Sequence, residues 1–200
     1  MELNYNGNPI YSMLILASAS PRRLQLLQQI GVKPDLVVPA QIDESPENGE
    51  RPATYARRMA KEKAQEVQKL HPKAFILSAD TVVVCGNQIL PKAEDIATAE
   101  YCLKKLSGRR HTVLGGVCLL HPDGKISLDI ATTKLKFRRL QPQEIKQYLD
   151  GKEWHGKAGG YAIQGSAAGF IPWINGCYNN VVGLPLAHIY PWLQHAGLVK

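Results

Sequence analysis

The sequence lacks the motifs that identify several common nucleotide-binding and metal-binding families. It contains neither a Walker-type nor a Rossmann-type glycine motif. None of its four cysteines forms a Cys-x-x-Cys pair, and no histidine spacing suggests a zinc site. Aromatic residues make up only 7% of the chain, so we expect a mainly aliphatic core, as α/β proteins often have. The function must be sought in other patterns.

Long apolar runs are also missing. The stretch at 13–17 is too short for a signal-peptide core or a membrane span, and residues 1–12 are polar with no basic start. Three of the cysteines lie in apolar or mixed runs, which favours core thiols and a reducing compartment. We therefore expect a cytoplasmic protein with no membrane contact. It would have an N-terminal extension at 1–12 and a single domain over 13–200.

The chain is basic, with a formal net charge of +7. Such a bias is typical of proteins that meet nucleic acid, an acidic membrane surface or an anionic small substrate. A basic surface without any partner explains the same number equally well. The charge becomes informative only through the positions of the cationic residues.

The pattern of apolar residues predicts a mixed α/β protein that begins with βαβ character. Leu14–Ala17 reads as a strand buried on both faces, and Ser20-Pro21 as a helix start with a hydroxyl cap. Further strands are expected at 35–39, at 74–79 with its end at Asp80, at 82–85 and 88–90 around a tight turn, and at 110–120 and 125–138 as a long hairpin; further helices are expected at 52–70, 94–106, 142–149 and 185–193.

The segment Ser18–Arg23 carries the first chemical signal. A buried strand ends there and a helix begins, so unpaired backbone N–H groups and the positive end of the helix dipole meet in one turn. Anions bind at such places, and hydroxyl and guanidinium groups add donors suited to phosphate. The competing interpretation is an ordinary helix cap followed by two surface arginines.

Four other charged residues are candidates for the same site. Asp80, expected at a strand end, could hold a divalent metal or activate water, but could also be a simple turn residue. Lys92, at a predicted helix start, could neutralise a phosphate. Glu44 could be a second carboxylate facing a metal. For Glu44, for Lys63 and for Lys92, a solvated surface position is the alternative.

The glycine-rich stretch Lys157–Gly165 is the third signal. Its three glycines allow the backbone to approach a ligand closely, and Gln164 offers both a donor and an acceptor, as recognition of a base requires. Lys157 adds a positive charge. A structural turn around a core Tyr161 is the alternative.

Together these segments resemble the Maf proteins, which are house-cleaning nucleoside triphosphate pyrophosphatases. The resemblance covers about residues 13 to 195 and rests on five motifs in order: Ser18–Arg23, Ala79–Val83, Leu106–His111, Lys157–Gly165 and Val181–Leu186. It implies an ITPase-like α/β fold, with a curved mixed β-sheet, flanking helices and two lobes around a central cleft. The Gln164 segment is similar to that of the subfamily acting on dTTP and UTP.

The resemblance also implies roles for individual residues. Asp80 matches the proposed proton acceptor, and Glu44, Lys63 and Lys92 match further polar cleft positions. The resemblance implies a divalent cation, Mg²⁺ or Mn²⁺, as the cofactor, and Asp80 and Glu44 as the residues that would hold it. The substrate-binding positions are Ser18, Ser20, Arg22, Arg23 and Lys157, and those linked to base specificity are Arg23, Thr81 and Gln164.

The chain departs from the family pattern at three places: Pro91 and Ala93 flank Lys92, Gly115 stands where threonine is frequent, and 154–156 lacks a common acid. The resemblance also implies a homodimer.

The activity that the resemblance implies is cleavage of dTTP or UTP to the monophosphate and pyrophosphate. The alternative is a regulator of septum formation that binds nucleotide or nucleic acid without hydrolysis.

Overall fold

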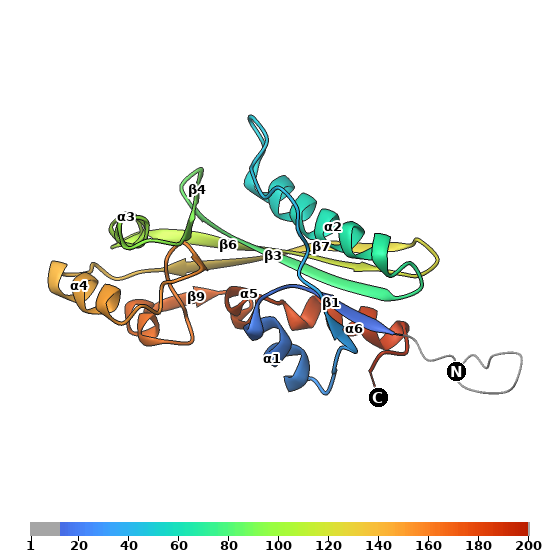
Figure 1. The fold of residues 1–200 in the computed structure, drawn as a ribbon. Helices are drawn as coiled ribbons and strands as arrows, with labels where there is room; N and C mark the ends of the chain where they lie inside the picture. Colours follow the sequence, from blue (N-terminus) through green and yellow to red (C-terminus); the bar gives the residue numbers. More distant parts are fainter. Residues whose placement is uncertain (1–12, 200) are drawn as a thin grey trace, which may run out of the picture.

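A mixed β-sheet forms the centre of the molecule. The structure, a computed structural model, describes residues 13–199; the extension expected at 1–12 lies outside them. The strands follow the order β2-β1-β3-β6-β7-β9, and β4 pairs with β3 beside this path. β1 is parallel to β2 and β3, and all other pairs are antiparallel (Figure 1). The bounds are Leu14–Ala17 for β1, Leu36–Val37 for β2, Phe75–Cys85 for β3, Gln88–Leu90 for β4, Arg110–Leu120 for β6, Ile126–Lys136 for β7 and Trp173–Asn175 for β9.

The strand β3 differs from the expectation. The sequence predicted one strand ending at Asp80 and another beginning at Val82, whereas the structure has a single strand of 11 residues. The reason is its long antiparallel partner: β6 pairs with β3 from Ile76 through Val84, which carries the extended backbone past Asp80. Asp80 therefore lies in mid-strand, not at a strand end.

Alternate residues of β3 face two different helical layers. Val82 and Val84 pack with Tyr55 and Met59 of α2 (Pro52–Leu70), which covers one face of the sheet. The residues between them, such as Val83, belong to the main core on the other face. That face is covered by α1 (Pro21–Gln29), α5 (Tyr178–Val182) and α6 (Leu186–His195), which lie on the opposite side from α2 in Figure 1. Asp80 and its neighbour Thr81 therefore point to opposite faces.

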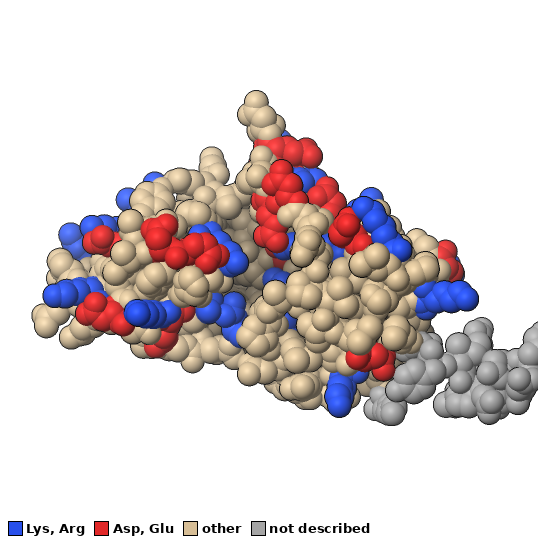
Figure 2. Space-filling view, in the orientation of Figure 1, with Lys and Arg blue, Asp and Glu red and all other residues tan. Residues whose placement is uncertain are grey.

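The remaining elements form a second part at one end of the sheet. Helices α3 (Ile96–Leu106) and α4 (Pro142–Asp150) lie there, together with a two-stranded sheet of β5 (Lys92–Ala93) and β8 (Lys157–Ala158) and the 3-10 helix at Ser166–Phe170. Figure 2 shows the surface hollowed between this part and the part that carries α2. The two lobes and the mixed α/β sheet expected from the resemblance are thus present. Among residues 13–199, no helix combines the length and the apolar character that a membrane crossing requires.

Helix α2 lies unusually close to the sheet at Gly116. A Cβ atom at this position would stand 2.0 Å from the carbonyl oxygen of Ala56. The small residues Ala56, Ala60 and Ala64 on the same helix face are fully buried, whereas Ala53 is exposed. The close approach lets side chains of α2 reach across to β3.

Replacing Gly116 by alanine should push α2 away from the sheet. Because the clash is with helix backbone, no side chain can move aside, and we expect the free energy of unfolding to fall by about 1–3 kcal/mol. Denaturant unfolding followed by circular dichroism measures this. Gly169→Ala is the control, since a Cβ there would have no atom of residues 13–199 within 4 Å apart from its own helix turn and chain neighbours. Equal stability of the two variants would contradict the close approach.

Candidate active site

A break in the sheet creates the candidate site. Strand β1 pairs with β3 only as far as Ala17 opposite Ser78, and β4 pairs with it only from Val83 onward. Within residues 13–199, the edge of β3 around Asp80 and Thr81 therefore has no strand beside it on that side. A cleft of about 720 Å³ opens at this gap and is lined by Asp80, Thr81, the segment 18–23 and the glycine-rich segment.

The turn at Ser18–Arg23 is organised around the Ser18 hydroxyl. Its Oγ accepts hydrogen bonds from the Ser20 backbone N–H at 3.1 Å and from the Arg23 guanidinium at 2.9 Å. Ser20 stands at the helix cap and Pro21 begins α1, as predicted, but the Ser20 side chain makes no capping hydrogen bond. Its hydroxyl lines the cleft instead.

The two arginines of the turn have different surroundings. Arg23 Nε donates to the Gly183 carbonyl at 2.9 Å, and its terminal nitrogens donate to Ser18 and, at 3.2 Å, to Thr81 Oγ1. With partners among the described residues, Arg22 makes one such bond, from Nε to the Val182 carbonyl at 3.2 Å. Burial lowers the pKa of both groups, and the Asp80 carboxylate opposes this for Arg23. Arg23 thus holds the turn together, while the end of the Arg22 guanidinium keeps its donors for a ligand.

The segment that holds these arginines is the motif at Val181–Leu186. Gly183 has a φ of +139°, a conformation that side chains disfavour, and the Arg23 side chain lies 3.7 Å from where a Cβ atom would stand, an ordinary van der Waals contact. The motif was visible in the sequence, but its role was not. The carbonyl groups of Val182 and Gly183 accept hydrogen bonds from Arg22 and Arg23, and these bonds fix the directions of the two side chains.

Lys63 connects the two carboxylates of the cleft. Its Nζ lies 2.7 Å from Asp80 Oδ1 and 2.9 Å from Glu44 Oε1, and only 8% of the residue is exposed. The alternative of a solvated helical lysine is therefore wrong. Within residues 13–199 no group donates a hydrogen bond to the second oxygen of Asp80, so that oxygen is available to a ligand or water.

Tyr55 stabilises the loop that carries Glu44, a contact that sequence reasoning missed. Its hydroxyl donates to the Glu44 carbonyl at 2.6 Å. Burial, with Asp80 and Glu44 nearby, raises the pKa of Tyr55 to about 12, so the hydroxyl stays protonated at neutral pH. Tyr55 and Lys63 lie two helical turns apart on one face of α2. This helical spacing is the signal in the sequence that could have placed Tyr55 near the site.

Two lysines face the carboxylates from the other lobe. In the small sheet, Lys92 pairs with Ala158 and Ala93 with Lys157, which places the two lysines diagonally. Lys92 forms an ion pair with Glu94 at 2.9 Å, and Lys157 donates to the His155 carbonyl. Burial lowers the pKa of Lys157, and the nearby charges of Arg22 and Lys92 lower it further. Three cations therefore share one part of the cleft.

The glycine-rich segment is fixed by buried contacts at both ends. The Tyr161 hydroxyl lies 2.8 Å from Nε2 of His111, and both residues are buried. The Glu153 carboxylate accepts from the Ser166 backbone N–H at 2.8 Å and occupies the space beside Gly165. Tyr161 is thus a core residue, as the structural interpretation of this segment expected. Gln164, which lies between the two fixed ends, is exposed and lines the cleft.

Every site residue predicted from the sequence lines this one cleft. The structure brings together residues from α1, α2, β3, the small sheet and three loops: Ser18, Ser20, Arg22, Arg23, Glu44, Lys63, Asp80, Thr81, Lys92, Lys157 and Gln164. Their roles as catalytic, substrate-binding or specificity residues stay predictions. What the geometry provides is a carboxylate pair held by one lysine, facing a group of cations.

Comparisons with known proteins show what this chain is similar to. A family model described as Maf-like protein matches residues 13–196. The dTTP/UTP pyrophosphatase of Paramagnetospirillum magneticum is 57% identical over 88% of this chain and 92% of its own length. That of Novosphingobium aromaticivorans is 54% identical over 92% of both. A solved dITP/XTP pyrophosphatase from Mycobacterium abscessus overlaps in part, with 17% identity, a TM-score of 0.40 and coverage of 64% of this chain and 75% of that one.

The His111–Tyr161 contact predicts a pH effect on stability. Burial lowers the pKa of His111 from 6.5 to about 4 in the folded chain. The unfolded chain therefore binds this proton first, so stability is complete above pH 6.5 and is lost as the pH falls toward 4, by about 3 kcal/mol for this group.

Urea unfolding at pH 7 and pH 4 tests this, with His111→Gln as the comparison. The difference in unfolding free energy between the wild-type protein and the variant should shrink by about 3 kcal/mol over this range. A difference that does not change with pH would show that His111 takes up its proton equally in both states.

Proposed function

This chain belongs to the Maf-like protein family, and from that premise we propose that it hydrolyses dTTP and UTP to the nucleoside monophosphate and pyrophosphate. Its relatives at 51–57% identity, which cover most of the chain, carry the name dTTP/UTP pyrophosphatase. The proposal rests on one observation: the Asp80–Lys63–Glu44 group lies in the same cleft as three further cations, Arg22, Lys92 and Lys157. Binding alone would need only the cations.

The triphosphate binds on the side of the cleft where the cations gather. Arg22, Lys92 and Lys157 reach it from α1 and from the small sheet, and the Ser20 hydroxyl lies at the start of α1. The α1 N-terminus adds its partial positive charge. Release of pyrophosphate places negative charge on the leaving oxygens, and these cations offset that charge.

A divalent cation fits the opposite side of the cleft. Among the described residues, no three His, Cys, Asp or Glu side chains come together, so a fully protein-made metal site is absent there. Mg²⁺ and Mn²⁺ are commonly held by one or two carboxylates together with substrate phosphates, and Asp80 and Glu44 provide these two carboxylates. When bound, the cation would draw charge from the phosphate oxygens.

Asp80 supports the attack of water on the α-phosphorus. Its free carboxylate oxygen accepts the proton as the new phosphorus–oxygen bond forms, and the bond from the α-phosphorus to the bridging oxygen breaks. The pyrophosphate leaves with that oxygen. Lys63, fixed at 2.7 Å, orients the carboxylate. Phosphoryl transfer of this kind depends mainly on positioning and charge stabilisation.

The base lies beside the glycine-rich segment. Gln164 is exposed to the cleft between two anchored positions, so its amide can pair with the edge of a pyrimidine. The contact between Arg23 and Thr81 at 3.2 Å forms the neighbouring wall. Base choice would therefore depend on Gln164 directly and on Arg23 and Thr81 through the shape of that wall.

Substituting Asp80 by asparagine tests the proposal. The variant keeps the size of the side chain but cannot accept the proton, so we expect kcat for pyrophosphate release from dTTP or UTP to fall by at least about 100-fold. Asp123→Asn, at an exposed hairpin turn, is the matched control and should keep full activity.

A panel of nucleoside triphosphates with product identification completes the test. Pyrophosphate from dTTP and UTP in the presence of Mg²⁺ or Mn²⁺ supports the proposal. Orthophosphate as the product would identify a phosphatase. Nucleotide binding without turnover, or near-normal turnover by Asp80→Asn, would favour the non-hydrolytic regulator instead.

A further inference from the structure

Two segments of the chain hold many cations and no carboxylate. Neither 101–122 nor 130–143 contains an aspartate or a glutamate. Four Lys or Arg residues lie in each of them: Lys104, Lys105, Arg109 and Arg110 in the first, and Lys134, Lys136, Arg138 and Arg139 in the second. The active site uses none of these residues. Their charge therefore requires another explanation.

The strand register brings the two segments side by side. Lys136 of β7 is paired with Arg110 of β6 on one side and with Trp173 of β9 on the other. Lys134 is flanked in the same way by Thr112 and Asn175. Paired residues point to the same face of a sheet, so Arg110, Lys134, Lys136 and Trp173 share one face. We call this group, with Arg109 and Arg139 at its end, the basic strip.

The basic strip lies on an uncovered part of the sheet. By the strand register its four sheet residues share the face that α2 covers, but they lie farther along than Val84 and Leu114, where the α2 core ends. Arg110, Lys134, Lys136 and Arg139 are exposed, and Trp173 is 38% exposed. The Arg110 guanidinium lies over the Trp173 ring, 5.2 Å from its centroid. Tryptophan and arginine are more frequent at binding interfaces than on the rest of a protein surface.

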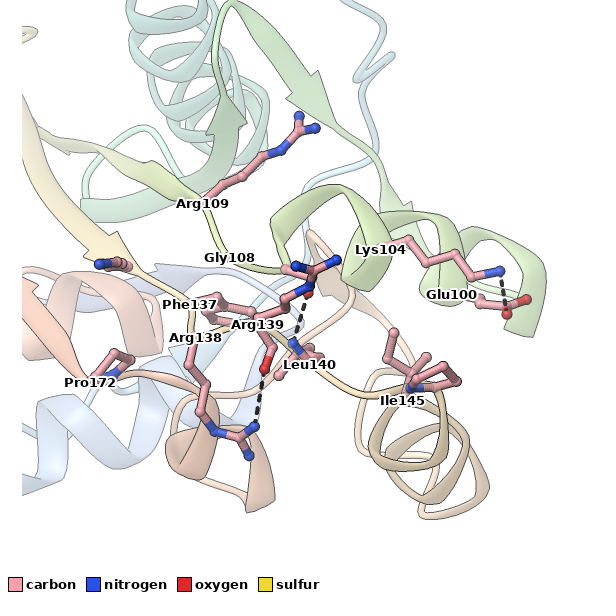
Figure 3. Close-up of a pocket in the computed structure, with 13 residues that line it drawn as sticks. Glu100, Lys104, Gly108, Arg109, Phe137, Arg138, Arg139, Leu140, Ile145 and Pro172 are labelled. Carbon is pink, nitrogen blue, oxygen red and sulfur yellow. Dashed lines mark hydrogen bonds and ion pairs between the residues drawn. The ribbon is translucent and has the colours of Figure 1, made fainter.

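Two open hollows follow the basic strip. One, of about 620 Å³, is lined by Arg110, Lys134 and Trp173. The other, of about 1060 Å³, is lined by Arg109, Lys136 and Arg139, with Leu140 and Ile145 on its apolar floor. Figure 3 shows Arg109, Arg139 and Lys104 around this larger hollow, with Arg109 extending away from Arg139 and Lys104 extending toward Glu100. Neither hollow shares a lining residue with the catalytic cleft.

The cations of the basic strip have no acidic partners within the described residues. Nearby, Lys104 is paired with Glu100 at 2.7 Å, and Arg138 with Glu144. In contrast, Arg109, Arg110, Lys134, Lys136 and Arg139 form no ion pair within residues 13–199. An extended polyanion would relieve their mutual repulsion along the whole length.

We propose that the basic strip binds single-stranded nucleic acid, separately from the catalytic cleft. A cationic groove that follows a phosphate backbone, with an aromatic side chain on which a base can stack, is the general way in which proteins bind single strands. A second copy of this chain fits less well, because a symmetric contact would bring the same unpaired cations together. The proposal does not depend on the catalytic assignment.

Fluorescence anisotropy with a labelled 15-nucleotide oligo(dA), and the same length of oligo(A), tests the proposal. Both should bind the full-length protein saturably in low salt and weaken as salt is added. The double variant Lys134→Glu/Lys136→Glu should bind at least about tenfold more weakly and show a smaller salt slope. Its pyrophosphatase kcat and its melting temperature should stay unchanged, which shows that it is folded.

The matched control is Lys33→Glu/Lys73→Glu, which makes the same charge change on exposed lysines at the opposite end of the sheet. It should weaken binding less than twofold. The proposal is overturned if no saturable binding occurs, if the control weakens binding as much as the strip variant, or if dTMP with pyrophosphate displaces the oligonucleotide. A change in oligomeric state caused by the strip variant, without nucleic-acid binding, would likewise overturn it.

Discussion

The two ion pairs of Lys63 hold the candidate site together. Through one ammonium group, at 2.7 Å from Asp80 and 2.9 Å from Glu44, they join α2, β3 and the loop before α2. The arrangement depends on backbone contact: α2 can reach β3 only because Gly116 lets Ala56 lie directly on the sheet. A buried ion pair is weak evidence for stability, since desolvation offsets the attraction. Its position in the cleft is better explained by chemistry than by folding.

The interrupted edge of β3 determines where the candidate site lies. Most of a sheet edge is either paired or covered, because bare backbone groups attract other strands. Here β1 stops at Ala17 and β4 reaches only as far as Leu90, opposite Val83, so a few residues of β3 face the cleft between two lobes. The alternation of side chains then sends Asp80 toward Lys63 and Thr81 toward Arg23. In the proposed function, one short segment thereby serves both the reacting phosphate and the wall beside the base.

Local patterns predicted much of this site, and contacts between distant segments account for what they missed. The turn at Ser18–Arg23 and the helix from Pro52 follow from nearby residues, and both were predicted well. The end of β3 was wrong because its partner, β6, lies far along the chain. The small sheet that carries Lys92 and Lys157 joins two-residue strands too short to leave a pattern. Tyr55 and the carbonyls at 182–183 act through such distant contacts too.

The most direct test of the central claim is the turnover of dTTP by Lys63→Met compared with Lys63→Arg. If Lys63 orients the two carboxylates for catalysis, the methionine variant should lose about 100-fold or more in kcat, as removal of a preorganised charge commonly does. The arginine variant should regain part of that loss, because it restores the charge. Turnover within a few fold of the wild-type protein for Lys63→Met, with its fold intact, would contradict the account.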